Sequence, residues 1–190
     1  MHRLSTSFVF GYHGCDRALG RKLIAGTSDF RKSDNDYDWL GPGVYFWEAN
    51  PDRALQFAEE KKSRRQGIAE PFVVGAVIDF GLCLDLTTAD SIEYLSLAHE
   101  SLKETFRVRG LQMPMNGPRP WERFLDCAVL RRLHEIIKDS SATQIDTVRG
   151  VFQEGQEVYP GSAFREKTHI QIAVMNPDCI KAVFRVSKTK

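Results

Sequence analysis

The order of strand-like and helix-like segments is the feature that most constrains the fold of this chain. Short runs rich in β-branched and aromatic residues occur near both ends, and two amphipathic helix patterns lie between them. The predicted strands cover residues 8–12, 43–47, 72–79, 148–152, 169–174 and 182–186, and the predicted middle helices cover 87–102 and 123–138. This segregation predicts an α+β fold. We expect two small packed sheets with a helical insert at about residues 87–140.

Two further helices are predicted in the first part of the chain. Asp16 is suited to the N-cap of a helix that ends at Gly26, because its carboxylate can accept hydrogen bonds from free backbone N–H groups. Asn50-Pro51-Asp52 opens a second helix with proline at an early position, where its missing N–H breaks no helical hydrogen bond. Residues 28–38 and 111–120, rich in polar residues and in proline respectively, are predicted loops.

The composition is that of one globular domain. The chain has 190 residues, of which 42% are hydrophobic and 27% charged, enough for a substantial core. Its 26 Lys and Arg residues nearly balance its 25 Asp and Glu residues, and the net charge is +1. This balance gives no global electrostatic reason to expect nucleic-acid binding, although it allows a local basic patch.

The cysteines and the N-terminus bear on the cellular compartment. Cys15, Cys83, Cys127 and Cys179 are scattered and form no Cys-x-x-Cys pair, so they indicate neither a disulfide framework nor a metal site. The first six residues lack the apolar run of a signal peptide, and no segment is apolar for long enough to span a membrane. We therefore expect a cytoplasmic protein that uses no metal and does not bind membranes.

Two short segments carry the strongest functional signal. Gly11-Tyr12-His13-Gly14-Cys15 places a His-Gly pair at the first strand, and residues 40–47 place an aromatic cluster after a glycine-flanked turn. Glycine lets a ligand approach the backbone closely, and an aromatic face binds a flat cationic ring. Neighbouring strand residues face opposite sides, so Phe46 is expected in the core. The two segments predict a pocket for the nicotinamide ring of NAD⁺, in an enzyme that cleaves NAD⁺ rather than reduces it.

The order of these segments resembles the ADP-ribosyltransferases of the diphtheria-toxin and poly(ADP-ribose) polymerase type. Tyr12-His13-Gly14 is similar to the family's histidine segment, residues 43–46 to its tyrosine segment, and residues 169–174 with 176–181 to its third segment. The resemblance covers roughly residues 8–80 and 148–186. It implies a single catalytic domain over residues 1–190, with a split β-sandwich fold and NAD as co-substrate.

The resemblance also implies roles for individual residues. His13 would hydrogen-bond the adenosine ribose of NAD, the backbone of Gly14 would hold the nicotinamide carboxamide, and Tyr45 would stack on the nicotinamide ring. Phe57, on the predicted second helix, is a further candidate for the NAD pocket. Arg53 stands where many relatives carry a small hydroxyl residue, and it is either a surface cation or a contact to an NAD phosphate.

The third member of the family's His-Tyr-Glu triad is replaced here. The corresponding strand carries His169 and Gln171, two residues apart and therefore on one face, but no carboxylate. Gln171 is the candidate because some relatives have Gln at this place; its amide can hydrogen-bond the ribose but cannot act as a base. Glu154 and Glu157, in the preceding loop, are candidates for the missing carboxylate and for contact with the acceptor.

Three functions follow from these observations. The first is a mono-ADP-ribosyltransferase that modifies a protein or a nucleic acid, as a bacterial toxin or defence effector does. The second is a non-catalytic module that binds NAD or ADP-ribose. The third is an NAD glycohydrolase or an RNA 2′-phosphotransferase-like enzyme. Arg64, Arg65, Arg131 and Arg132 are the candidate RNA contacts, and residues 113–119 form a loop that could select the acceptor or bind an inhibitory protein.

Overall fold

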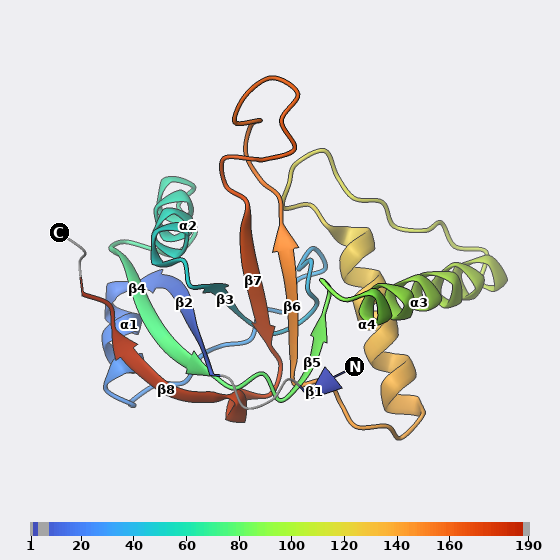
Figure 1. Ribbon diagram of the computed structural model, residues 1–190, viewed down its shortest axis with the longest axis horizontal. Coiled ribbons are helices and arrows are strands. Elements are labelled where there is room, and N and C mark those ends of the chain that lie inside the picture. Colours follow the sequence, from blue (N-terminus) through green and yellow to red (C-terminus); the bar gives the residue numbers. More distant parts are fainter. Residues whose placement is uncertain (1, 4–7, 188–190) are drawn as a thin grey trace.

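The computed structural model describes residues 2–3 and 8–187, and in this part of the chain one sheet of eight strands is flanked by four α-helices (Figure 1). The strands are β1 (His2–Arg3), β2 (Val9–Asp16), β3 (Val44–Glu48), β4 (Pro71–Ile78), β5 (Leu82–Asp85), β6 (Thr147–Phe152), β7 (His169–Val174) and β8 (Ile180–Arg185). Their spatial order is β1-β5-β6-β7-β3-β2-β4-β8. All neighbours are antiparallel except β5 and β6. The expected mixture of strands and segregated helices is confirmed.

The α-helices of the described residues are α1 (Arg17–Ile24), α2 (Pro51–Ser63), α3 (Ala89–Val108) and α4 (Phe124–Asp139), with a short 3₁₀ turn at Pro177–Cys179. The first two, α1 and α2, begin at the caps that the sequence predicts. Asp16 caps α1 by accepting a hydrogen bond from the backbone N of Ala18 at 2.9 Å, and Asn50 caps α2 through the backbone N of Arg53, also at 2.9 Å. Gly26, just past α1, has a φ of +67°, which is costly for other residues and ends the helix.

The expectation of two separate sheets is corrected, because hydrogen bonds join all the strands into one. The joint at the centre is narrow: β2 and β3 pair only at Gly11 with Glu48 and at Tyr12 with Trp47. By contrast, β2 pairs with β4 over all eight of its residues. One half of the sheet (β2, β4, β8) is therefore linked to the other half (β3, β7, β6, β5, β1) over a short stretch, beyond which no ladder connects the described residues of β2 and β3. This place is called the β2–β3 split below.

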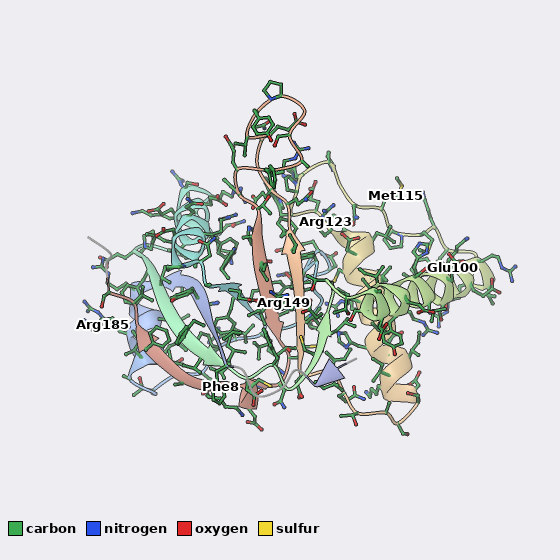
Figure 2. The ribbon with its side chains drawn as sticks, in the orientation of Figure 1. Phe8, Glu100, Met115, Arg123, Arg149 and Arg185 are labelled. Atoms are coloured by element: carbon green, nitrogen blue, oxygen red, sulfur yellow. The ribbon has the colours of Figure 1, made fainter. Side chains whose placement is uncertain are left out.

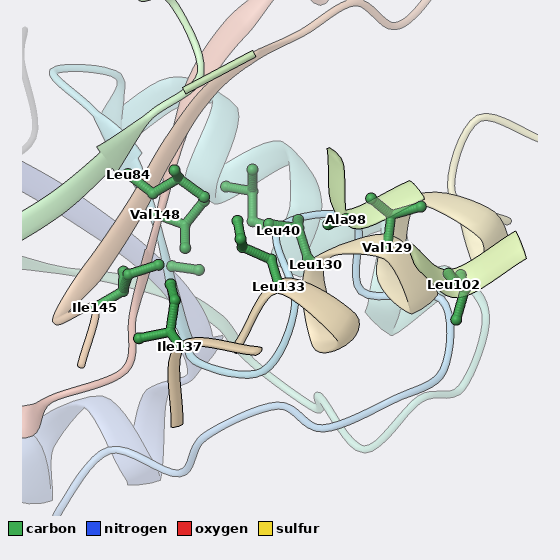
Figure 3. Packing of buried hydrophobic residues seen from close by; sticks show 11 residues of the cluster. Leu40, Leu84, Ala98, Leu102, Val129, Leu130, Leu133, Ile137, Ile145 and Val148 are labelled. Atoms are coloured by element: carbon green, nitrogen blue, oxygen red, sulfur yellow. The ribbon is translucent and has the colours of Figure 1, made fainter. Parts of the chain in front are cut away.

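The helical insert shares a core with the sheet (Figure 3). Side chains of α3 and α4 pack against Leu84 of β5, Val148 of β6 and Ala173 of β7 in one buried cluster. Leu40, from the loop before β3, is completely buried in the same cluster. The insert therefore covers one face of the second half-sheet and is part of the domain's core.

Ionic contacts tie the strands together on the opposite face. Arg149 of β6, near the centre of the sheet in Figure 2, contacts Glu48 of β3 at 2.6 Å and Asp85 of β5 at 3.1 Å. Because β5 spans only four residues, it shows no alternating pattern long enough to identify from sequence, and it is absent from the predicted strands.

Candidate functional site

Strand alternation sorts the predicted site residues onto two faces of the sheet. Tyr12 pairs with Trp47, and Trp47 pairs with Gln171, so the three form a row across β2, β3 and β7. Tyr45 lies two residues from Trp47 and hence on the same face. Phe46 points to the other face and is completely buried, as predicted.

His13 bridges the β2–β3 split. Its Nδ1 lies 2.8 Å from the backbone oxygen of Tyr45, and because a carbonyl can only accept, the ring donates from Nδ1. The ring packs edge-to-face on Phe30 and tilted on Phe46, with centroids 5.3 and 5.7 Å away. Burial lowers the pKa of His13, so the imidazole is neutral and Nε2 is an acceptor. The structure thus joins His13 to the Tyr45 backbone but places the two side chains on opposite faces.

The Tyr45 hydroxyl holds the turn that precedes β3. It donates to the backbone oxygen of Gly41 at 2.7 Å and accepts from the backbone N of Leu40 at 3.1 Å. Its ring packs against the cluster that includes α3 and α4. Burial raises the pKa of this hydroxyl well above its ordinary value, so it remains a hydrogen-bond donor. Tyr45 therefore packs against the core with its ring and holds the turn with its hydroxyl.

Removing this hydroxyl should loosen the turn. We expect Tyr45→Phe to lower the free energy of unfolding by about 2 kcal/mol, because it leaves two buried backbone groups without partners. Chemical denaturation followed by tryptophan fluorescence measures the change, and Tyr159→Phe on an exposed loop is the matched control. Equal stability of Tyr45→Phe and the wild type would show that the hydroxyl does not hold the turn.

Another group approaches Gly14 closely, as the sequence predicts, but that group belongs to the chain itself and is not a ligand. A Cβ placed at Gly14 would lie 2.1 Å from the backbone oxygen of Ala54 on α2, so only glycine fits between β2 and this helix. The contact brings the start of α2, including Arg53, against the β2–β3 split. The ring of Phe57 stacks on Trp47 with centroids 4.8 Å apart, which places Phe57 beside the same face.

Arg53 is a buried cation rather than a surface residue. Only 5% of its surface is exposed, and its Nη2 lies 2.6 Å from Oε2 of Glu154. Its Nη1 lies 3.6 Å from Oε1 of Glu60 on α2, and Glu60 also contacts Lys167 at 2.8 Å. These contacts attach both ends of the β6–β7 loop to α2. The structure brings Glu154, but not Glu157, into contact with a residue of the predicted NAD pocket.

Glu157 has a local role in the β6–β7 loop, which projects beyond the sheet at the top of Figure 1. Its carboxylate contacts Arg165 at 3.4 Å and accepts from the backbone N of Gly161 at 2.8 Å. Both contacts lie within the loop, so Glu157 stabilises the projecting segment.

Gln171 is oriented by a residue that no sequence motif indicates. Its Oε1 accepts a hydrogen bond from Nε1 of Trp39 at 2.6 Å. Only 9% of Gln171 is exposed, and among the described residues its Nε2 amide has no hydrogen-bond partner. Trp39 follows a polar loop, and its side chain packs on Phe152 with centroids 4.9 Å apart. The amide is thus held at a fixed angle with one group free to donate and a second lone pair free to accept.

His169 completes the cluster from the start of β7. Its ring lies between Trp47 and Phe152, with centroids 6.1 and 5.6 Å away, and its Nδ1 donates to the backbone oxygen of Lys167 at 2.5 Å. Burial lowers the pKa of this imidazole, which leaves Nε2 as an acceptor.

Several buried polar atoms of this cluster lack hydrogen-bond partners among the described residues. They are Nε1 of Trp47, Nε and Nη1 of Arg53 and Nε2 of His169. Buried polar groups are nearly always paired, so a group of unpaired ones on a single face indicates a ligand site. Three of the four atoms are donors, which suits the oxygen atoms of a phosphate or a carboxamide. We call Trp47, Arg53, Glu154, His169 and Gln171 the Arg53 cluster.

Comparisons with known proteins leave the family open. No family model and no solved structure matches the chain. An uncharacterized protein of the archaeon Methanocaldococcus jannaschii, MJ0359, is 23% identical over 191 aligned positions, which cover 90% of this chain and 83% of the relative. Within the described residues, no group of three or more His, Cys, Asp or Glu side chains is arranged to hold a metal ion, and no helix has the length and apolar character needed to cross a bilayer.

Proposed function

We propose that this chain is an NAD-dependent mono-ADP-ribosyltransferase that modifies a macromolecule. The observation that carries the proposal is the Arg53 cluster, whose unpaired donors and acceptor lie beside Gly14 and on the same face as Tyr45. Segments far apart in the chain, such as those of Trp47 and Gln171, meet there, and they are singled out by their resemblance to one family. The narrow β2–β3 joint, bridged by His13, further supports a split-sheet NAD site.

The residues of the cluster suit the parts of NAD⁺. Nε and Nη1 of Arg53 make no hydrogen bond within the described residues, although Nη1 lies 3.6 Å from Glu60, and they can donate to a phosphate oxygen while Glu154 balances the charge of the guanidinium. Nε1 of Trp47 can donate to a second oxygen. The neutral His169 offers its unpaired Nε2 as an acceptor for a sugar hydroxyl on the same face. The cluster therefore offers both donors for the anionic part and an acceptor for the sugar, while His13 lies on the opposite face and bridges the β2–β3 split.

Gln171 is placed to stabilise the reacting ribose. Breaking the bond between ribose and nicotinamide leaves the sugar with positive charge, and an oxygen that accepts the 2′-hydroxyl proton strengthens its hydrogen bond as that charge develops. Oε1 of Gln171 can accept a second hydrogen bond while Trp39 holds the amide. Oε1 of Glu154 is free of hydrogen bonds from described residues and can orient an acceptor.

Incubation with NAD⁺ tests this proposal directly. We expect nicotinamide release, and transfer of label from adenine-labelled NAD⁺ to protein or nucleic acid. Gln171→Ala should lower kcat by about 10²-fold with little change in KM, because the hydrogen bond that it removes acts mainly in the transition state. Gln171→Glu keeps the oxygen acceptor and should retain activity. Gln144→Ala, an amide removed from an exposed loop, is the matched control.

A non-catalytic NAD-binding or ADP-ribose-binding module is the second candidate. The observation that favours it is that β7 (His169–Val174) carries no carboxylate at all. Such a module would bind NAD⁺ without releasing nicotinamide, and Gln171→Ala would change affinity only. Release of nicotinamide without transfer of label would instead identify a glycohydrolase.

A further inference from the structure

An aromatic and basic surface lies at the C-terminal end of α2, where the loop between α3 and α4 meets it. Trp121 of this loop is 39% exposed, and the guanidinium carbons of Arg64 and Arg119 lie 4.2 and 5.5 Å from its ring centroid. Nearby on α2, Nζ of Lys61 lies 4.8 Å from the centroid of Phe57. Cations and aromatic rings thus alternate here. We call Lys61, Arg64, Arg119 and Trp121 the Trp121 surface.

Basic side chains continue around α2 into a groove. The groove has a volume of about 1070 Å³ and lies between α1 and α2, above β4 and β8. Its charged lining consists of Arg17, Arg21, Lys62 and Arg185 against Asp52 and Glu59. In Figure 2, α2 stands between Arg185, on the edge strand β8, and Arg123, at the end of the α3–α4 loop. Lys61 and Lys62 are consecutive on α2 but point in directions about 100° apart, so the groove and the Trp121 surface lie on different sides of the same helix.

Of the four arginines named from the sequence as RNA contacts, Arg64 belongs to the Trp121 surface, whereas Arg131 and Arg132 are engaged within the chain. Arg131 is paired with Asp34, and Arg132 contacts Glu135 at 3.1 Å and the hydroxyl of Ser101. Both arginines are therefore engaged on α4 by neighbouring groups. Arg119 is likewise paired with Glu122, whereas Arg64 has no carboxylate within ion-pair distance in the described part of the chain. Its exposed charge is available to an external anion.

The Trp121 surface borders the Arg53 cluster on two sides. Two residues after Trp121, the guanidinium carbon of Arg123 lies 5.7 Å from the centroid of Phe152, and Phe152 packs on His169. On α2, Phe57 is shared between Lys61 and Trp47. A polymer held on the Trp121 surface therefore lies next to the proposed site of ADP-ribose transfer.

We infer that the Trp121 surface binds single-stranded nucleic acid and presents it as the acceptor. Phosphates supply the negative charge that Lys61 and Arg64 attract, and unstacked bases supply flat rings for Trp121 and for the guanidinium planes beside it. A duplex hides the faces of its bases, and an acidic peptide has charge but no ring, so neither uses both features. The role as acceptor rests on the proposed transferase activity, whereas the binding surface does not.

Fluorescence anisotropy with a labelled 12-nucleotide single-stranded RNA of mixed sequence tests the surface. Trp121→Ala should weaken binding by roughly tenfold, and Trp121→Phe, which keeps a stacking face, should recover most of the affinity. Arg64→Glu should weaken binding and make it less dependent on salt, by about 0.7 in the log–log slope for each phosphate that the protein no longer neutralises. Arg107→Glu makes the same charge change on α3, where Arg107 is paired with Glu104, and should stay within about twofold.

Other outcomes would overturn the inference. Equal binding of the RNA by the wild type and Trp121→Ala would do so, as would binding of a 12-residue polyglutamate peptide or of duplex RNA as tightly as the single strand. Label transfer from NAD⁺ separates the two proposals. If RNA binding depends on Trp121 but neither nicotinamide release nor labelling occurs, the transferase proposal fails and the surface stands. If nicotinamide is released but substitutions of Trp121 and Arg64 do not change RNA binding, the inference of an RNA-binding surface is wrong and the transferase proposal stands.

Discussion

Glu154→Gln should lower the free energy of unfolding by about 3 kcal/mol, because it leaves a buried guanidinium without its main partner. The side chains of Arg53 and Glu154 are only 6% and 13% exposed, and the two charged groups are 2.6 Å apart. The remaining carboxylate, on Glu60, is 3.6 Å from Arg53 and also serves Lys167. Equilibrium unfolding in urea, followed by circular dichroism, measures the decrease.

Two further variants identify its cause. Arg53→Met combined with Glu154→Gln removes both charges and should recover most of the stability, since no unpaired charge remains. Glu157→Gln, in the same loop, breaks a contact whose side chains are 37% and 40% exposed and should cost less than about 1 kcal/mol. If the double variant were as unstable as Glu154→Gln, the instability would come from packing of the β6–β7 loop instead.

The variant Glu154→Gln also tests the role of Glu154 in the proposed reaction. Under the proposed function, Glu154→Gln should depress transfer of label more than hydrolysis of NAD⁺, because water needs less positioning than a macromolecule. Measurement well below the midpoint of thermal unfolding separates this effect from instability. A variant inactive in both reactions, with its fold intact, would show that Glu154 takes the third triad role in place of Gln171.

Much of the secondary structure could be predicted because its determinants are local. The caps of α1 and α2 are side chains within two or three residues of the groups they bind, and the long strands β2, β4 and β7 are rich in aromatic and β-branched residues. The joining of the sheet could not be predicted, because strand register depends on partners far away in sequence. The two pairs between β2 and β3 illustrate this limit.

The candidate site likewise has features that the sequence could predict and others that it could not. The glycine at position 14 could be recognised as a place of close approach, but not that the approaching atom is the backbone oxygen of Ala54. Trp39 follows a polar loop and is 132 residues from Gln171, so nothing local indicated that it orients this amide. Strand alternation could have placed Trp47 on the face of Tyr45, because the two residues are separated by one position. The unpaired atoms of the cluster become visible only once the burial of each side chain is known.

Acidification should destabilise the protein through its buried histidines, among them His134 of α4. Burial, with a smaller contribution from the nearby Arg131, lowers the pKa of His134 from its ordinary 6.5 to about 4, and its Nε2 is buried without a hydrogen-bond partner among the described residues. Between these two pH values the unfolded chain binds more protons than the folded one, so stability falls as the pH falls. The full difference between the two pKa values corresponds to about 3 kcal/mol of folding stability, which is lost as the pH falls from 6.5 to 4. Burial lowers the pKa of His13 and His169 as well, and both add to the destabilisation in the same direction.

Urea unfolding at a series of pH values tests this expectation. His134→Leu removes the buried imidazole, so its free energy of unfolding should fall by about 3 kcal/mol less than that of the wild type over this range. Protonation of carboxylates contributes equally to both proteins and cancels in the comparison. His99→Leu is the matched control, because it makes the same substitution at a side chain that is 39% exposed on α3. Parallel curves for His134→Leu and the wild type would show that His134 does not titrate as a buried group, and the acid sensitivity would then belong to His13 at the β2–β3 split and to His169 of the Arg53 cluster.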